Sequence, residues 1–419
     1  MVSFKFSKLA FKQECKLIKN WKENTVYISI MQLTLLIVNF FLITIISREY
    51  GAKTYGEYAS SKSLSVLIGT ATVMSLALVV TKVLAQNNEN SKFMFSSSYF
   101  LICRNFLISL IVLVPLTSML NRDLSMTFLF LLGFVFNEMI HVALAYFQSR
   151  GDFVTSSKQI FLRTILYGIG AWMIVISGFS INTLISYQVL MLLVFFIIAH
   201  KSIPRKDVIL KTKNPKKVKN ELQSSGKKMV LTTFSSALIS ELDIVLLGLF
   251  YTGPILGVLA WSRRILEIIF QLLAASLDIL FPELSKTKEK NEVKEVRTKL
   301  RKVFLLSFSI PIAFFFLRGI AKDIFVSLLG NEFSDVSTYT SSILFCLPLM
   351  VWSRINIIFS RALNFEINLT KSISIGAVLS CGIYFLMHNI GFNSAVLSIV
   401  FSQISIAILT TISFRKSYV

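Results

Sequence analysis

Six basic residues lie inside long apolar stretches of this chain, where a charge is costly unless it faces a partner or a water-filled space. They are Lys82, Arg104, Arg163, Arg263, Arg264 and Arg354. A guanidinium group presents its donors in a planar fork that matches the oxygens of a phosphate. These residues therefore predict a binding site for an anionic, phosphate-bearing substrate.

The six bases differ in depth. Lys82 and Arg163 lie within about two turns of the ends of their apolar runs, from which a long side chain can reach the membrane surface. Arg104 is similarly placed, but its fork suits a phosphate better. The others lie roughly eight or more residues inside, ~12 Å at the helical rise per residue, and we expect them to line a cavity. These deeper residues are Arg263, Arg264 and Arg354.

Acidic residues at similar depth predict a second kind of chemistry. Glu138 and Glu241 each lie about 12 residues into an apolar run, ~18 Å into a ~30 Å hydrocarbon core. Glu138 and His141 are three residues apart and share a helix face. A carboxylate at this depth can bind Na⁺ or H⁺, because its charge is poorly solvated without a cation. The predicted ion-coupling residues are Glu138, His141, Glu241 and Asp243.

Pairing is the alternative role for some of these charges. Glu267 lies three residues after Arg264 and four after Arg263, so one helix can neutralise itself, and we favour pairing for Glu267. Glu241 and Asp243 are separated by about 200° around a helix and cannot face one cavity together. The sequence leaves open which of the two faces inward.

The elements that position these residues are hydrophobic helices. The chain is 54% hydrophobic and 16% charged, with a mean hydropathy of +0.69, which is far more apolar than soluble domains. About twelve runs are long enough to cross a bilayer. The predicted spans are 25–47, 63–85, 97–120, 126–148, 156–177, 184–203, 229–251, 255–281, 303–325, 340–363, 371–388 and 394–414. The fold class is therefore an all-α integral membrane protein.

The basic residues indicate the orientation of these spans. Most of the 43 Lys and Arg residues lie in the N-terminal segment, in the loops after even-numbered spans and in the C-terminal segment. The positive-inside rule then places both termini in the cytoplasm. Because the charge follows alternate loops, the net charge of +21 does not indicate nucleic-acid binding. The run 25–47 is too long for a signal peptide and is expected to be a retained span.

A basic stretch near the middle divides the chain. We expect a six-helix half at 1–205, a cytoplasmic linker at 206–228 and a second six-helix half at 229–419. The pattern G-x-[YL]-A-x-S-[KR] occurs at 56–62 and again at 257–263, after the first span of each half. Six spans per half predict parallel repeats related by a pseudo-two-fold axis along the membrane normal, with a central cavity between them.

Several motifs resemble the Wzx-type polysaccharide and O-antigen flippases of the multidrug/oligosaccharidyl-lipid/polysaccharide exporter superfamily. The segment from Ser47 to Tyr58 is similar to the family's G-x(3,4)-Y-G-x-Y turn, although Leu259 replaces the expected Tyr in the second copy. The residues from Leu242 to Gly248 resemble its D-x-x-L-L-G span. Further similar segments are Gly257, Arg263, Phe281 to Ser285, and Leu329 to Phe333.

The resemblance implies a function. It implies ion-coupled flipping of an undecaprenyl-pyrophosphate-linked oligosaccharide, such as an O-antigen unit of lipopolysaccharide, across the bacterial inner membrane. The implied partners are this lipid-linked substrate, membrane lipids, and the polysaccharide polymerase and chain-length proteins. No cofactor is expected beyond Na⁺ or H⁺ as the coupling ion. The four cysteines show no CxxC spacing, so neither a metal site nor a disulfide framework is expected.

Two other function classes remain as alternatives. A drug or cation antiporter of the same superfamily needs acids and aromatic residues in its cavity, whereas a pyrophosphate lipid needs cations, and the six embedded bases favour the lipid. A membrane polysaccharide polymerase or glycosyltransferase needs a long hydrophilic loop with catalytic groups, but the outer loops are short and the long inner loop is nearly all Lys. The absence of a Walker motif argues against direct use of ATP. We therefore expect a transporter and not an enzyme.

Overall fold

The fold is helical throughout the part of the chain that the computed structural model describes. That part comprises 3–73, 76–86, 91–119, 122–150, 152–204, 233–234, 237–238, 240–278, 298, 300–362, 366–387 and 393–418. The predicted linker 206–228 lies outside these residues. The all-α class expected from the composition is confirmed.

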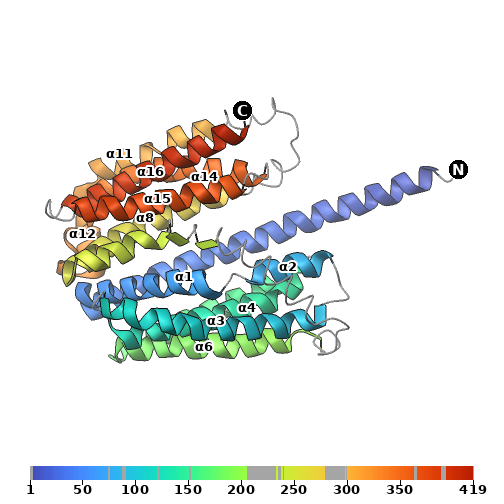
Figure 1. Ribbon diagram of the computed structural model, residues 1–419, viewed down its shortest axis with the longest axis horizontal. Coiled ribbons are helices and arrows are strands. Elements are labelled where there is room, and N and C mark those ends of the chain that lie inside the picture. Colours follow the sequence, from blue (N-terminus) through green and yellow to red (C-terminus); the bar gives the residue numbers. More distant parts are fainter. Residues whose placement is uncertain are drawn as a thin grey trace. The chain divides into compact units, whose positions relative to one another are not determined.

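The first part of the chain forms long helices. They are α1 Ser3–Val73, α2 Leu76–Gln86, α3 Ser91–Met119, α4 Leu124–Ser149, α5 Phe153–Ile176 and α6 Ile181–Lys201 (Figure 1). Gly51 interrupts α1 with φ 78° and ψ 171°, a backbone conformation that a residue with a Cβ rarely adopts. The interruption lies between the predicted span 25–47 and the predicted span 63–85, which covers the end of α1 and most of α2. Asp152 and Ser180 cap α5 and α6 by accepting a hydrogen bond from the backbone N–H of Thr155 and Thr183.

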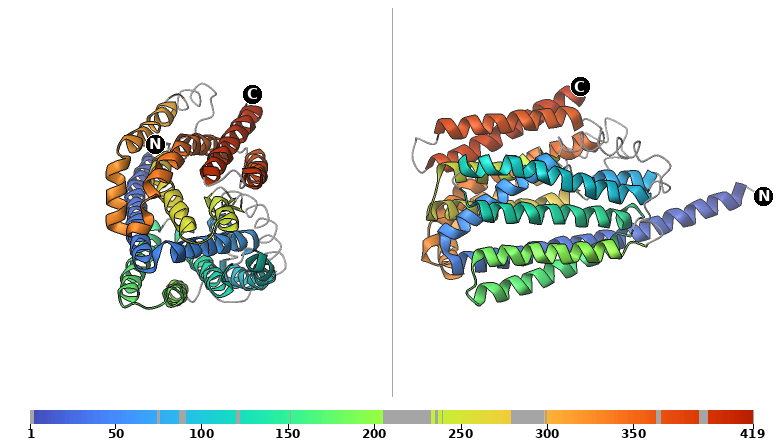
Figure 2. Two further views of the ribbon diagram at one scale, coloured as in Figure 1. Left: turned by 90° about the vertical axis from the view of Figure 1, so that its left-hand side faces the viewer. Right: turned by 60° about the horizontal axis from the view of Figure 1, so that its bottom comes forward.

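The second part contains both long and short helices. Residues 240–250 are helical and precede α8 Pro254–Asp278. The elements that follow are α11 Ser309–Phe316, α12 Arg318–Leu329, η3 Asn331–Phe333, α13 Val336–Ile343, η4 Leu344–Cys346, α14 Leu347–Ala362, α15 Glu366–Met387 and α16 Asn393–Tyr418. Helices α15 and α16 lie side by side (Figure 1), as do α5 and α6 (Figure 2).

Eight helices in the described residues are long and apolar enough to cross a membrane, or nine if a bent pair counts as one span. The bent pair corrects one detail of the prediction. Residues 303–325 were expected to form one span, but Leu300–Phe316 and Arg318–Leu329 meet at 74°. The apolar run ends at Leu317, and α12 exposes Arg318 and Lys322, which are poorly accommodated in hydrocarbon.

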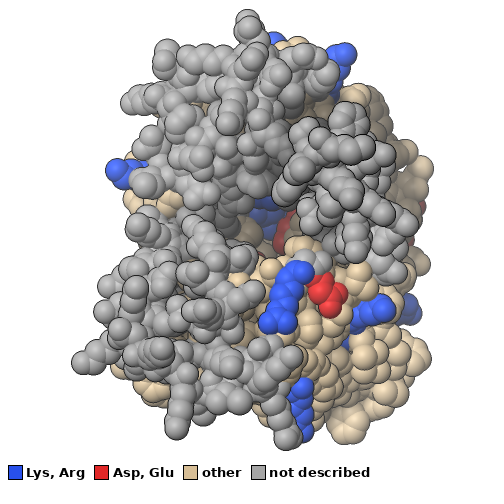
Figure 3. Space-filling model, turned by 90° about the vertical axis from the view of Figure 1, so that its right-hand side faces the viewer, with Lys and Arg blue, Asp and Glu red and all other residues tan. Residues whose placement is uncertain are grey.

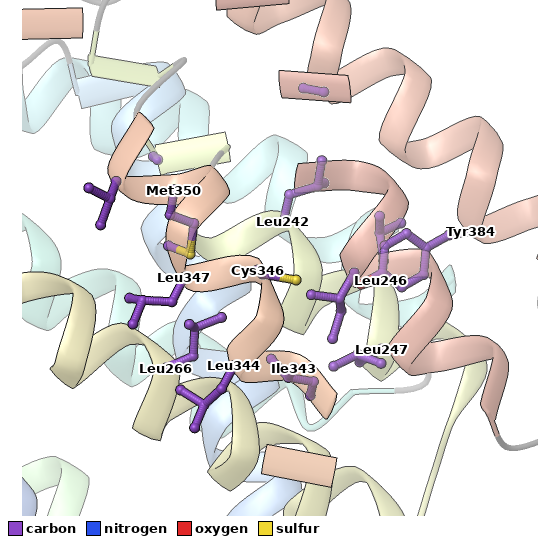
Figure 4. Close-up of a cluster of buried hydrophobic side chains, with 14 of the residues drawn as sticks. Leu242, Leu246, Leu247, Leu266, Ile343, Leu344, Cys346, Leu347, Met350 and Tyr384 are labelled. Carbon is purple, nitrogen blue, oxygen red and sulfur yellow. The ribbon is translucent and has the colours of Figure 1, made fainter. Parts of the chain in front are cut away.

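The chain divides into two compact units. Unit 1 comprises 1–43, 75–104 and 135–226, and unit 2 comprises 44–74, 105–134 and 227–419. The core of unit 2 joins residues 240–250 to helices α8, α13 and α14 through Leu, Ile and Met side chains, and to α15 through Ala377 and Tyr384 (Figure 4). The predicted division into sequential halves related by a two-fold axis, with a cavity between them, stays a prediction.

Candidate functional site

Two groups of charged side chains form inside unit 2, and helix α8 contributes to both. We call the first the buried ion pair; it consists of Arg263 and Asp243. We call the second the α8 charge cluster; it consists of Lys62, Glu241, Arg264 and Glu267. Arg263 and Arg264 are adjacent, so they point about 100° apart around α8 and reach different neighbours.

The buried ion pair is almost fully removed from solvent. Arg263 Nε lies 3.2 Å from Asp243 Oδ2, and the two side chains are 1% and 3% exposed. Tyr384 of α15 donates to Asp243 Oδ1, and Gln403 of α16 donates to Asp243 Oδ2, both at 3.4 Å. Buried charges require such partners, because an unpaired ion in the interior costs several kcal/mol. Arg263 and Asp243 thus tie residues 240–250 to three helices.

The α8 charge cluster joins α1, residues 240–250 and α8. Ser63 Oγ donates to Glu241 Oε2 at 2.7 Å, and Arg264 Nη1 donates to Glu267 Oε2 at 2.6 Å. Gln271 Nε2 donates to the other oxygen of Glu267, Oε1, at 2.8 Å. The Arg264 and Glu267 side chains are 20% and 14% exposed, so this pair is more accessible than the buried ion pair.

Lys62 of α1 adds a second positive charge to the α8 charge cluster. It is close enough to interact with Arg264, Glu241 and Glu267. Tyr55, two turns earlier on α1, interacts with Arg264 and Glu267. The two acids and two bases give the cluster a formal charge of zero. The pairing expected for Glu267 is confirmed, with Arg264 as the partner.

Glu241 and Asp243 point to different groups, as their angular separation predicted. Asp243 faces Arg263 in the core between α8, α15 and α16, whereas Glu241 faces Ser63 and Lys62 on α1. Asp243 is therefore engaged in packing in this conformation. Of the two acids, Glu241 is the one that lies among the more accessible charges.

Unit 1 holds the other predicted site residues with described contacts. Arg163 of α5 donates from Nη1 to Asn137 Oδ1 of α4 at 2.9 Å. Arg163 also lies close enough to His141 to interact with it. His141 and Glu138 are half-buried on α4, and Arg104 is half-buried on α3. This arrangement brings the predicted base Arg163 to the predicted ion-coupling helix.

The remaining predicted bases are placed as follows. Lys82 lies on α2, and Arg354 is half-buried on α14 of unit 2. Figure 3 shows one face of the molecule, on which basic and acidic side chains occur together and some are recessed behind other atoms. The convergence of the bases of both halves on one vestibule stays a prediction.

Sequence reasoning did not include Lys62 among the candidate site residues. A signal was present, because Lys62 occupies the same position in the first copy of the repeated pattern as Arg263 does in the second. The position after it is Ser63 in one copy and Arg264 in the other. The first copy therefore contributes Lys62 to the α8 charge cluster, and the second copy is followed by Arg264 of the same cluster and supplies Arg263 to the buried ion pair.

The repeated segments also contact each other directly. A Cβ added to Gly56 would lie 2.7 Å from the backbone nitrogen of Gly257, and a Cβ added to Gly257 would overlap the carbonyl group of Ala52. Trp261 Nε1 donates to Ser47 Oγ at 2.5 Å across the same contact. Helices α1 and α8 therefore pack backbone against backbone just beside the α8 charge cluster.

A third motif segment joins this contact. Glu332 Oε2 in η3 accepts a hydrogen bond of 2.8 Å from the backbone N–H of Ala52, the first residue after the break at Gly51. A carboxylate at this position satisfies a free donor and complements the helix dipole. The segments at Ser47–Tyr58, Gly257 and Leu329–Phe333, which carried the family resemblance, thus lie together in unit 2.

The comparison with protein families decides the family. A model described as "Polysaccharide biosynthesis protein" matches residues 86–338, more than half of the chain. The chain belongs to this family. Like its relatives with known structures, this polysaccharide biosynthesis protein is a multi-pass membrane protein.

One relative carries a functional description. The probable low-salt glycan biosynthesis flippase Agl15 of Haloferax volcanii is 22% identical over 305 residues, which cover 72% of this chain and 63% of the relative. The chain therefore spans less than two thirds of that relative's length. The flippase description belongs to the relative.

Solved structures show the fold. An inward-facing multidrug resistance MATE family transporter of the MOP superfamily matches with a TM-score of 0.69 at 14% identity, over 94% of this chain and 98% of that one. The MATE transporter VcmN of Vibrio cholerae in the bent form matches with a TM-score of 0.60 at 13% identity, over 96% and 98%. A MOP superfamily transporter from Pyrococcus furiosus matches with a TM-score of 0.53 at 12% identity, over 95% and 96%. The fold is that of membrane transporters, as expected.

Proposed function

We propose that this protein is a flippase that moves an undecaprenyl-pyrophosphate-linked oligosaccharide, such as an O-antigen repeat unit, across the bacterial inner membrane by alternating access. The observation that carries this proposal is the family match over residues 86–338, since its description concerns polysaccharide biosynthesis. The transporter fold and the flippase description of the Haloferax relative support it. Both termini are proposed to be cytoplasmic.

The embedded bases suit such a substrate. A pyrophosphate cannot cross hydrocarbon unaided, because moving charge into a low dielectric costs several kcal/mol even after relaxation. Guanidinium groups lower this barrier through charge-assisted, bidentate hydrogen bonds. Arg264 is better placed for this role than its neighbour Arg263, because Arg264 is partly exposed, whereas Arg263 is enclosed with Asp243. The polyprenyl tail can remain in lipid during transfer.

Complementation tests this function. A strain whose own flippase gene is deleted should regain surface polysaccharide when this chain is expressed with a compatible set of glycosyltransferases. Arg264→Ala should reduce export strongly and Arg264→Lys less, since Lys keeps the charge but loses the fork. Arg318→Gln on the exposed face of α12 is the matched control and should export normally. If membranes that contain normal amounts of the wild-type chain restore no polysaccharide, the proposal is wrong.

A gradient of Na⁺ or H⁺ is proposed to drive transport through Glu138, His141, Glu241 or Asp243. Replacing each acid by its amide should reduce gradient-driven transport, and the protein level should stay near normal in Glu138→Gln and Glu241→Gln. Asp243→Asn also disturbs the buried ion pair, so Glu138→Gln and Glu241→Gln are the more informative variants. If all three amide variants complement a deletion strain fully, the embedded acids have no part in coupling.

A drug or cation antiporter is the second candidate, because multidrug MATE transporters are among the structures with this fold. The two functions predict substrates of opposite charge, an anionic lipid for the flippase and a cationic drug for the antiporter. Expression in a drug-sensitive strain should not raise the tolerated concentration of cationic dyes if the substrate is an anionic lipid. A clear increase in tolerance that requires Glu241 would favour the antiporter.

A further inference from the structure

Helix α12 carries an exposed row of large apolar side chains. Leu317, Ile320, Ile324 and Leu328 follow one another at intervals of three or four residues, so they fall within about 80° of one face of the helix. Their side chains are between 38% and 62% exposed. We call these four residues the α12 stripe. A contiguous exposed apolar surface marks a contact with an apolar partner.

The other faces of α12 differ from the stripe. Phe325 and Val326 are half-buried and Leu329 is buried, and α12 packs against η3 and α13. Arg318 and Lys322 are exposed, lie four residues apart and point more than about 100° away from the middle of the stripe. Neither base forms an ion pair with a residue that the structure describes. The helix therefore has an apolar side and a basic side that both lack a protein partner in the described part of the chain.

The bend before α12 determines how it lies in a membrane. Leu300–Phe316 and Arg318–Leu329 meet at 74°. Because a span stands on average only ~20° from the bilayer normal, α12 lies closer to the membrane plane than to the normal. Its 12 residues are ~18 Å long, but they advance only about 5 Å along the direction of the preceding span. The helix thus stays at nearly one depth.

The charges and the apolar residues together define that depth. Phe315 and Phe316 on the last turn of α11 are exposed, as expected for side chains in hydrocarbon. Arg318, Lys322 and Asp323 are exposed directly after them, and charges are costly in hydrocarbon. Water would leave the α12 stripe uncovered, whereas hydrocarbon would leave the charges unsolvated. The boundary between acyl chains and headgroups is the environment that suits both sides of α12.

We propose that α12 is an interfacial helix that binds the surface of the phospholipid bilayer. The α12 stripe lies among the upper carbons of the acyl chains, and Arg318 and Lys322 bind the phosphates of the headgroups. Amphipathic helices with basic residues on the polar face bind membranes in this way, and long basic side chains reach headgroups while their stems stay in apolar surroundings. The proposal concerns the lipid around the protein and does not rest on the proposed substrate.

A contact within unit 2 indicates which leaflet is involved. Glu332, three residues beyond the end of α12, accepts a hydrogen bond from the backbone N–H of Ala52. Ala52 follows the first predicted span and belongs to a predicted outer loop. Helix α12 is therefore on the same side of the membrane as that loop, which is the outer leaflet in the predicted topology.

Depth measurements test the position of the helix. Single cysteines at 318–329 in a full-length Cys-free chain would be spin-labelled in vesicles of phosphatidylethanolamine and phosphatidylglycerol. Collision rates would be measured with oxygen, which concentrates in hydrocarbon, and with a water-soluble nickel complex. Positions 320, 324 and 328 should share one high ratio of oxygen to nickel collisions, and positions 319, 322 and 323 should show a low one. A label at 316 on α11 is the control for hydrocarbon.

Reversing the basic charges tests the contact with phosphate. With the label at 324, the double variant Arg318→Glu/Lys322→Glu should lower the oxygen-to-nickel ratio severalfold, because carboxylates are repelled by phosphates. The matched control Arg318→Lys/Lys322→Arg keeps both charges and should keep the ratio. In dodecyl maltoside, which has no phosphate, the charge-reversed variant should melt at the same temperature as the wild type. A lower midpoint there would assign the two bases to contacts within the protein and overturn the proposal.

The other outcomes are equally decisive. A depth that increases steadily from 318 to 329 would show a re-entrant segment that enters the hydrocarbon. Equal access of nickel to every position would place α12 in water. Low access of both reagents along the α12 stripe would show that protein covers it, such as a second copy of this chain. Each of these three results overturns the proposal, and so does an unchanged ratio in the charge-reversed variant.

Discussion

Gly257 is a position at which the backbone of α8 lies close to that of α1, and its substitution by Ala gives a quantitative test of this contact. The new Cβ would lie 2.7 Å from the carbonyl carbon and 3.0 Å from Cα of Ala52, whereas ordinary contact begins at 3.4 Å. The neighbour is backbone and cannot rotate away. The carbonyl oxygen of Ala52 is closer still. The two helices must therefore separate by more than about 1 Å, an overpacking that costs about 1–3 kcal/mol of unfolding free energy.

The direction of the change in stability distinguishes a close contact from an ordinary helix position. In a helix interior, Gly→Ala normally stabilises by about 0.5–1 kcal/mol, because Ala loses less conformational entropy on folding. Gly382 on α15 and Gly319 on α12 are matched controls, since an added Cβ meets no atom within 4 Å at either position. Thermal unfolding of the purified protein in detergent should give a lower midpoint for Gly257→Ala and an equal or higher one for the controls.

The same variant should also affect transport. The contact between Gly56 and Gly257 lies beside the α8 charge cluster, so separating the helices displaces Lys62 relative to Arg264. Export of polysaccharide should fall severalfold in Gly257→Ala at equal protein level. If Gly257→Ala unfolds and transports like Gly319→Ala, the close backbone contact between α1 and α8 does not exist in the membrane and the geometry of the cluster is wrong.

Three further predictions follow from the charges. Single cysteines would be placed in a Cys-free background and treated with an impermeant thiol reagent. Cysteines within 201–228 should react only after the cells are opened, whereas cysteines within 389–393 should react in intact cells. Labelling of 201–228 from outside would refute the topology. Asp243→Asn should destabilise the protein by about 3–5 kcal/mol, because it leaves the buried Arg263 without its counter-charge, and a melting temperature equal to the wild type would contradict the ion pair. Glu138→Gln should keep the melting temperature within a few degrees while slowing gradient-driven transport, measured in vesicles, and unchanged transport would exclude it from coupling.

The helices themselves could be predicted because hydropathy records them directly. A membrane segment must satisfy its backbone internally, so a long apolar run can only be a helix. The runs 97–120, 126–148 and 156–177 therefore match α3, α4 and α5 closely. The bend after α11 was missed, because hydropathy averaged over a window does not distinguish a straight span from an apolar helix followed by an amphipathic one.

The pairing of the site residues could be predicted only in part. The spacing of Arg264 and Glu267 along one helix is fixed by the helix itself, so this contact followed from the sequence. The contacts of Lys62 with Glu241 and of Arg263 with Asp243 depend on how neighbouring helices are rotated about their axes. That rotation is set by packing at Gly56 and Gly257 and across the core of unit 2, which no local pattern records.

Helix α8 shows why two adjacent arginines can have different roles. Arg263 is enclosed by residues from 240–250, α15 and α16, and its bond to Asp243 is shielded from any ligand. Arg264 lies about 100° further round the helix, toward α1, where its partner Glu267 belongs to the same helix and is partly exposed. Under the proposed function, exchanging that partner for a substrate phosphate would break no hydrogen bond between helices. The buried bond of Arg263 thus helps to fix the position of α8, and Arg264 on the same helix is the arginine that the proposed function assigns to the substrate.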